Sequence, residues 1–143
     1  MVEASRIFAA VMRYYTESDM ACLPEFTLKT NRRPDITCLA KDGTIIMVEV
    51  KSSVADFKAD QKWPDYVDWA DFFYFAVDDS FPTQILPDDS QCGIIITDGF
   101  DCHILRHSPE KKLPAARRSH LIRRLARHAM RRQYFMMAEQ EDK

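Results

Sequence analysis

Two carboxylates and an amine lie at the ends of two short apolar segments. Asp35 precedes the segment 36–40, Glu49 lies near the end of the segment 45–50, and Lys51 follows it. Carboxylate oxygens suit Mg²⁺ or Mn²⁺, which typically keeps several waters for a substrate phosphate. An amine beside such an ion can hold an attacking water and offset charge on the phosphate. Together these residue types are what a metal-dependent phosphodiesterase site needs.

A β-hairpin is the element that must bring these groups together. The segments 36–40 and 45–50 are rich in β-branched residues, and Asp42-Gly43 between them is a turn signal. The sequence therefore predicts an antiparallel hairpin. Because side chains alternate along a strand, Glu49 and Lys51 share one face.

The hairpin register decides whether Asp35 joins Glu49 and Lys51. A loop centred on Asp42 places Asp35 opposite Glu49, and a loop centred on Gly43 places it opposite Lys51. An even-length loop turns Asp35 to the other face unless a bulge intervenes. The alternative to a catalytic site is a salt bridge between Glu49 and Lys51 that closes the strand.

The surroundings of these residues resemble a known nuclease superfamily. Pro34-Asp35 and Glu49-Val50-Lys51 match the motif of the PD-(D/E)xK nucleases. A longer pattern is similar to the MmcB-like bacterial DNA repair protein family over nearly the whole chain. It comprises Arg32-Arg33-Pro34-Asp35, Val48 to Ser53, Asp56 to Tyr66, Phe75-Ala76-Val77 and Ala116-Arg117-Arg118.

The resemblance implies an α/β, restriction-endonuclease-like fold, with a central mixed β-sheet flanked by helices. It also implies a small nuclease-like protein that acts in DNA repair. Glu25 is a candidate fourth acidic catalytic residue, since many relatives of this fold place a carboxylate there or on the first helix. Asp35 and Glu49 would bind the metal, and Lys51 would assist the water.

Residues near the motif are candidates for DNA contact. Arg32 or Arg33 can clamp a phosphate next to the site. Lys62 and Trp63 allow two interpretations: contact with a phosphate and stacking on a base, or, for Trp63, capping of the core where Pro64 turns the chain. By contrast, we expect the nearby aspartates to be surface charges or helix-end partners; these are Asp56, Asp60 and Asp65.

A long helix from about residue 115 to 138 gives a second functional signal. Its arginines lie in a stretch without acidic residues: Arg117, Arg118, Arg123, Arg124, Arg127, Arg131 and Arg132. Most fall on one half of the helix, opposite an apolar stripe. A row of guanidinium groups can follow a nucleic-acid backbone, and the predicted DNA contacts are Arg117, Arg118, Arg124 and Arg131. The alternative is a solvated face that pairs with the acidic surface of residues 56–79.

The remaining elements follow from hydrophobic pattern and turn residues. The predicted helices are 4–15, 54–62 and 64–69, and the predicted strands are 22–28, 72–77, 93–97 and 102–106, besides the hairpin. The continuous aromatic run 72–77 indicates a strand buried on both faces and therefore central in the sheet.

Composition agrees with one globular domain over residues 1–143. Hydrophobic residues make up 46% of the chain and charged residues 29%, which is ordinary for such a domain. The net charge of −2 hides an asymmetry: residues 101–143 carry 11 Lys/Arg against 5 Asp/Glu, and residues 1–100 carry 9 against 17. No apolar run reaches membrane-span length and no signal-peptide pattern begins the chain, so we expect a cytoplasmic location and no membrane partner.

Three functions are consistent with these patterns. The first is a Mg²⁺- or Mn²⁺-dependent nuclease that engages DNA in repair. The second is a DNA-binding or partner-binding repair accessory that cleaves poorly or not at all. The third is an interaction module whose arginine helix meets an acidic protein. A homodimer is compatible with all three.

Overall fold

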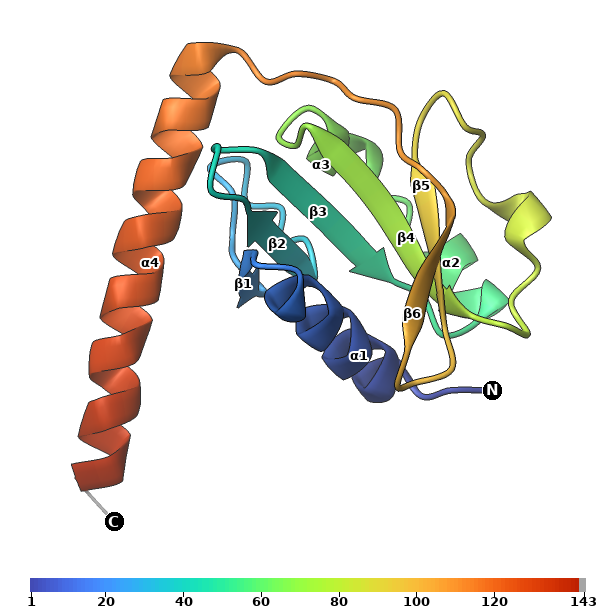
Figure 1. The fold of residues 1–143 in the computed structure, drawn as a ribbon, viewed down its shortest axis with the longest axis horizontal. Coiled ribbons are helices and arrows are strands. Elements are labelled where there is room, and N and C mark those ends of the chain that lie inside the picture. Colours follow the sequence, from blue (N-terminus) through green and yellow to red (C-terminus); the bar gives the residue numbers. More distant parts are fainter. Residues whose placement is uncertain (142–143) are drawn as a thin grey trace.

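The protein folds around one six-stranded sheet (Figure 1). The computed structural model describes residues 1–141. The helices are α1 (Ala4–Glu17), α2 (Val54–Ala59), α3 (Pro64–Val67) and α4 (Ala115–Glu141), with a 3-10 helix η1 (Thr83–Ile85). The strands are β1 (Ala21–Pro24), β2 (Ile36–Leu39), β3 (Ile45–Val50), β4 (Phe72–Asp78), β5 (Gly93–Thr97) and β6 (Cys102–Arg106).

The sheet is mixed, and its strands lie in chain order from β1 to β6. Strands β3, β4 and β5 are parallel, while the pairs β1–β2, β2–β3 and β5–β6 are antiparallel. The expected central position of the aromatic strand is confirmed, because β4 lies between β3 and β5 and is buried along nearly its whole length. The predicted mixed sheet and long C-terminal helix are therefore present.

Helices cover both faces of this sheet. Helix α1 lies across one face, where Ile7 and Val11 pack with Val48 and Ile95. The other face packs against α2, α3 and the first turns of α4, with Phe57, Tyr66 and Leu121 among the buried residues. Two apolar clusters thus hold the helices against the two faces of the sheet. The polar side chains at the strand ends, such as Glu49, are held in place by this packing.

The hairpin register matches a loop centred on Asp42. Ile36 pairs with Val48 and Leu39 with Ile45, so the next position outward sets Asp35 opposite Glu49. Gly43 adopts a φ of 91°, a conformation that glycine takes at little steric cost. The turn chemistry of the loop therefore brings the two acidic residues to the same end of the hairpin.

Three predicted elements end at least two residues early, and one of them is the helix predicted for 64–69, which ends at Val67. The strand predicted for 22–28 ends at Pro24, because Glu25 has a φ of 52° and leaves the extended conformation. The helix predicted for 54–62 ends at Ala59, where Asp60 becomes extended. Its carboxylate accepts a hydrogen bond from the backbone N–H of Lys62 at 3.2 Å, which favours a turn over a further helical residue.

Helix α4 stands beside the β1 edge of the sheet and extends past it (Figure 1). Its residues Leu121 and Leu125 are buried, whereas most of its later residues are exposed. Between residues 1 and 141, none of the helices is long and apolar enough to cross a bilayer.

Candidate functional site

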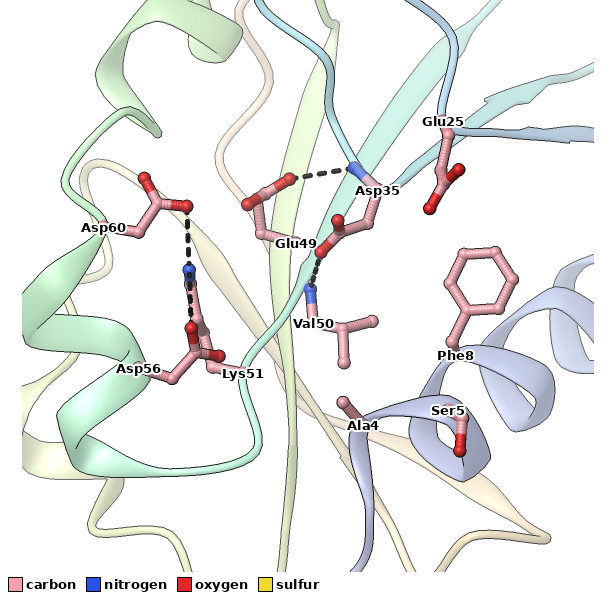
Figure 2. A pocket seen from close by; sticks show the side chains of 10 residues that line it. All are labelled: Ala4, Ser5, Phe8, Glu25, Asp35, Glu49, Val50, Lys51, Asp56 and Asp60. Atoms are coloured by element: carbon pink, nitrogen blue, oxygen red, sulfur yellow. Dashed lines mark hydrogen bonds and ion pairs between the residues drawn. The ribbon is translucent and has the colours of Figure 1, made fainter.

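Reciprocal hydrogen bonds connect the two acidic residues of the hairpin. The backbone N–H of Asp35 donates to Glu49 Oε1 at 2.9 Å, and the backbone N–H of Val50 donates to Asp35 Oδ2 at 2.8 Å (Figure 2). Each carboxylate therefore has one oxygen held by the backbone. The other oxygen of each makes no hydrogen bond to the rest of residues 1–141 and remains available to a ligand.

Burial makes this pair of carboxylates electrostatically unfavourable. Glu49 is 4% exposed and Asp35 is partly buried. Burial, together with the neighbouring Asp35 carboxylate, raises the pKa of Glu49 to about 8. Burial also raises the pKa of Asp35, against the opposing effects of the Val50 N–H and the Lys51 ammonium. A cation between the two groups would remove this penalty, and the pair therefore has the character of a cation site.

The raised pKa of Glu49 predicts that Glu49→Gln stabilises the metal-free protein at alkaline pH. The Glu49 carboxyl holds its proton more tightly in the folded state than in the unfolded state. The contribution of this protonated carboxyl to the free energy of unfolding is therefore complete below about pH 4.5 and is lost as pH rises through about 8. We expect Glu49→Gln to raise the free energy of unfolding by about 1 kcal/mol or more at pH 9, or about 3 °C in melting temperature. The difference should vanish near pH 5.

Thermal unfolding in EDTA at pH 5, 7 and 9 measures this effect. Glu17→Gln, at an exposed position on α1, is the control and should show no such pH-dependent gain. A Glu49→Gln protein less stable than wild type at pH 9 would contradict the electrostatic assignment.

Lys51 points its ammonium toward α2. Its side chain is 4% exposed, and Nζ lies 3.2 Å from Asp60 Oδ2 and 4.0 Å from Asp56 Oδ1. Figure 2 shows the ammonium between these two aspartates, on the opposite side of Glu49 from Glu25. Lys51 therefore forms its ion pairs with Asp60 and Asp56, and not with Glu49 as in the alternative considered from the sequence.

The roles of Asp56 and Asp60 were missed in the sequence. Both lie at the ends of α2, as predicted, and both also hold the buried ammonium of Lys51. Their spacing of four residues, directly after the strand that carries Lys51, is the feature that could have revealed them. Residues four apart project from the same side of a helix, and Asp60 directly follows the last residue of α2.

Glu25 lies at the edge of the same pocket. Its backbone N–H donates to the carbonyl of Asp35 at 2.9 Å, so the ends of β1 and β2 are tied together beside the acidic pair. Its exposed side chain extends toward the space between Asp35 and Phe8 (Figure 2). The predicted fourth acidic residue is thus brought to the site, at greater exposure than Glu49.

Two hollows meet at Asp35, Glu49 and Asp60. One has a volume of about 440 Å³ and is lined by Ala4, Ser5, Phe8, Glu25, Asp35, Glu49, Val50, Lys51, Asp56 and Asp60. The other has a volume of about 430 Å³ and is lined by Thr27, Asn31, Arg32, Arg33, Asp35, Glu49, Asp60, Lys62 and Tyr66. The acidic pair is therefore reachable from one side past neutral and acidic groups and from the other past basic groups.

Asp35 and Glu49 suit a divalent ion that keeps most of its water ligands. They do not form a site in which protein groups supply all the ligands. Within residues 1–141, no three His, Cys, Asp or Glu side chains are arranged to hold a metal ion. Mg²⁺ needs fewer protein ligands, because it commonly binds through one or two carboxylates and keeps its other waters. Asp35 and Glu49, each with a free oxygen, fit that requirement.

The four predicted DNA contacts near the motif differ in their surroundings. Arg33 and Lys62 are exposed and line the basic hollow. Arg32 lines it too, with its Nε 2.7 Å from Asp65 Oδ2 in a solvent-accessible ion pair. Trp63 instead packs on the core, with its ring stacked on Phe73 at a centroid distance of 6.3 Å. The core-capping interpretation of Trp63 is therefore the one that the structure favours.

Arg118, one of the predicted DNA contacts, is already paired within the protein. Its guanidinium donates to both carboxylate oxygens of Asp71, at 2.6 and 2.7 Å, and to the carbonyl of Gly43 at 2.7 Å. Asp71 is 2% exposed. Arg118 therefore anchors the start of α4 to the sheet.

Two more of the predicted arginine contacts also reach back to the protein. Arg117 donates to the carbonyl of Asp68 at 2.7 Å, and Arg124 donates to the carbonyl of Thr27 at 3.2 Å. Arg131 is exposed. Through Arg117 and Arg118 the start of α4 does meet the segment 56–79, but at a backbone carbonyl and at the buried carboxylate of Asp71 and not at an acidic surface.

Comparisons with known proteins agree with this architecture. One solved structure that is similar is described as "SPO1766 protein of unknown function from Silicibacter pomeroyi", at 37% sequence identity and a TM-score of 0.87. The alignment covers 96% of this chain and 92% of that one. No curated protein matches the sequence. A scan of protein families matches residues 2–141 to the family described as "DNA repair protein MmcB-like". The chain therefore belongs to the MmcB-like family of DNA repair proteins.

Proposed function

We propose that this protein is a Mg²⁺- or Mn²⁺-dependent deoxyribonuclease of the PD-(D/E)xK superfamily, with a restriction-endonuclease-like fold, that acts in DNA repair. The observation that carries the proposal is the reciprocal hydrogen bonding of Asp35 and Glu49, which presents one buried and one partly buried carboxylate at one pocket, with Lys51 on the same strand end. The description of the family as DNA repair proteins supports DNA as the substrate.

Some residues of the pocket would bind the ion, and others would position the substrate. Asp35 and Glu49 would hold the ion, and Glu25 would contribute through a bridging water. When bound, Mg²⁺ or Mn²⁺ would act as a Lewis acid on a phosphate oxygen and lower the pKa of an attacking water. Arg33 and Lys62, exposed on the rim of the basic hollow, would hold a neighbouring phosphate of the DNA backbone.

Lys51 would stabilise the charge that develops on the phosphate. Its ammonium is buried and held by Asp60 and Asp56, so its position is fixed before substrate arrives. A preorganised charge in a partly enclosed pocket loses little energy to reorganisation during the reaction. Asp60 and Asp56 are then positioning residues for Lys51.

A repair accessory without cleavage is the second candidate. It is favoured by one observation: two aspartates already neutralise Lys51, which leaves its ammonium directed toward α2 in the absence of DNA. In that case the acidic pair would bind an ion that organises the hairpin, while Arg33 and Lys62 bind the phosphate backbone.

Incubation of the purified protein with single-stranded, duplex and forked DNA distinguishes the two candidates. The nuclease predicts strand breaks that require Mn²⁺ or Mg²⁺ and disappear in EDTA. The accessory predicts salt-sensitive binding to at least one of these DNAs without breaks in either metal. An absence of DNA binding at low salt, with or without metal, would contradict both.

A further inference from the structure

One side of α4 carries a stripe of exposed residues that no part of the described chain covers. Steps of four, three, four, three and four residues separate its members, which are Arg123, Arg127, Met130, Tyr134, Met137 and Glu141. This spacing keeps them on one side of a helix. Met130 is 73% exposed, Tyr134 65% and Met137 53%.

The stripe lies opposite the side of α4 that packs on the protein. Leu121 and Leu125, the buried residues of the helix, project about half a turn away from it. Within residues 1–141, the last hydrogen bond from α4 to the body of the protein is from Arg132 to the carbonyl of Pro24, at 3.0 Å. Beyond it the helix extends past the sheet (Figure 1). The stripe is thus a free surface of large apolar groups.

The stripe is complementary to itself when two copies run antiparallel. With the centre of the pair at residue 132, Arg123 of one helix meets Glu141 of the other, and Arg127 meets Met137. Met130 meets Tyr134 near the axis. Opposite charges then lie at both ends and apolar groups in the middle, which is what a two-fold, self-complementary contact requires.

We propose that α4 binds α4 of a second copy of this chain through this stripe, as an antiparallel two-helix interface. Residues 123–141 span about 28 Å of helix. The three apolar side chains of each copy pack against those of the other, and the stems of Arg123 and Arg127 cover their flanks. The contact is smaller than the roughly 800 Å² per partner of a standard interface. The dimer is therefore weak and depends on concentration.

Nucleic acid fits this stripe less well than a second copy does. Phosphates would match Arg123 and Arg127, but they would leave Met130, Tyr134 and Met137 in water and would be repelled by Glu141. Free nucleic-acid contacts also remain at the rim of the basic hollow, at Arg33 and Lys62. The dimer proposal does not depend on the nuclease proposal.

Sedimentation equilibrium of the full chain over a range of concentrations tests the interface. We expect a monomer–dimer equilibrium whose dissociation constant rises by about tenfold or more in Met130→Lys and in Tyr134→Lys. Met136→Lys makes the same change at a methionine that is 53% exposed and lies about 120° around the helix from Met130, and it is the matched control. It should dimerise like the wild type.

A charge swap tests the antiparallel register. Arg123→Glu and Glu141→Arg should each weaken the dimer, because like charges then face each other at both ends. Both substitutions together should restore it. A monomer at every concentration, a dimer unaffected by the stripe substitutions, or single swaps that the combination does not rescue would each overturn the proposal. The proposal would also be overturned if the protein were monomeric and the stripe variants lost DNA binding, because the stripe would then bind nucleic acid.

Discussion

Asp71→Ala is expected to lower the free energy of unfolding by about 3–5 kcal/mol, because it breaks a buried ion pair on one side only. The carboxylate of Asp71 accepts hydrogen bonds from the backbone of Ile45 and Leu113, at 2.8 and 2.9 Å, besides the two from Arg118. It thus connects the start of β3, the segment before α4 and α4 itself. Without it, two backbone N–H groups lose their partner, and the Arg118 guanidinium keeps only the carbonyl of Gly43.

Urea unfolding followed by the fluorescence of Trp63 and Trp69 measures this loss. The matched control is Asp65→Ala, which removes the carboxylate of the exposed Arg32–Asp65 pair and should cost at most about 1 kcal/mol. Equal effects of the two substitutions would contradict a structural role for Asp71.

Acidification provides an independent measure of the same pair. Burial alone would raise the pKa of Asp71, but the hydrogen bonds from Arg118, Ile45 and Leu113 hold it at about 2. Because this pKa is below the ordinary value of 3.8, the ionised group stabilises the fold fully above about pH 4. That contribution, about 2 kcal/mol, is lost as pH falls toward 2. The gap in stability between wild type and Asp71→Asn should narrow over the same range.

The proposed nuclease activity predicts that Lys51→Ala reduces DNA cleavage by about a thousandfold in Mn²⁺. The ammonium is the one basic group buried beside Asp35 and Glu49 in the described pocket, and Asp60 and Asp56 fix its position. Its removal takes away a charge that would stabilise the reacting phosphate. It also takes away a positive charge near the ion, so Mn²⁺ binding should persist.

Cleavage rates, together with Mn²⁺ binding followed by electron paramagnetic resonance, separate these two effects. Lys58→Ala is the control, since Lys58 is exposed on the neighbouring helix α2. Asp60→Asn tests positioning and should lower the cleavage rate less than Lys51→Ala does. Wild-type cleavage by a folded Lys51→Ala protein would remove Lys51 from the mechanism. Loss of Mn²⁺ binding would assign it to the ion site instead.

The geometry of the acidic pair could be narrowed to a few arrangements from the sequence because local chemistry limits the hairpin. The Asp42-Gly43 turn and the alternation of side chains limited the hairpin to a few registers, and one of them puts Asp35 opposite Glu49. Strands β5 and β6 have the bounds that their residues predicted, since Asp98-Gly99 between them is also a local turn signal.

The partners of the charged side chains could not be predicted in the same way. The alternation of side chains predicts that Lys51 lies beside Glu49, yet its ammonium lies against α2. Arg118 was placed on a DNA-binding face, yet it is held by Asp71, 47 residues away in the chain. Residue type says that a buried charge needs a partner, but many carboxylates in this chain could serve.

The sequence by itself determined the hairpin, the central aromatic strand and the small set of registers open to Asp35, because turn geometry and the two-residue period of a strand act over a few residues. The structure selected the register in which Asp35 lies opposite Glu49. Only the tertiary structure decided which carboxylate each basic group would meet and which side of α4 would face water. Those outcomes depend on how the helices pack across the sheet, where segments far apart in the chain come into contact.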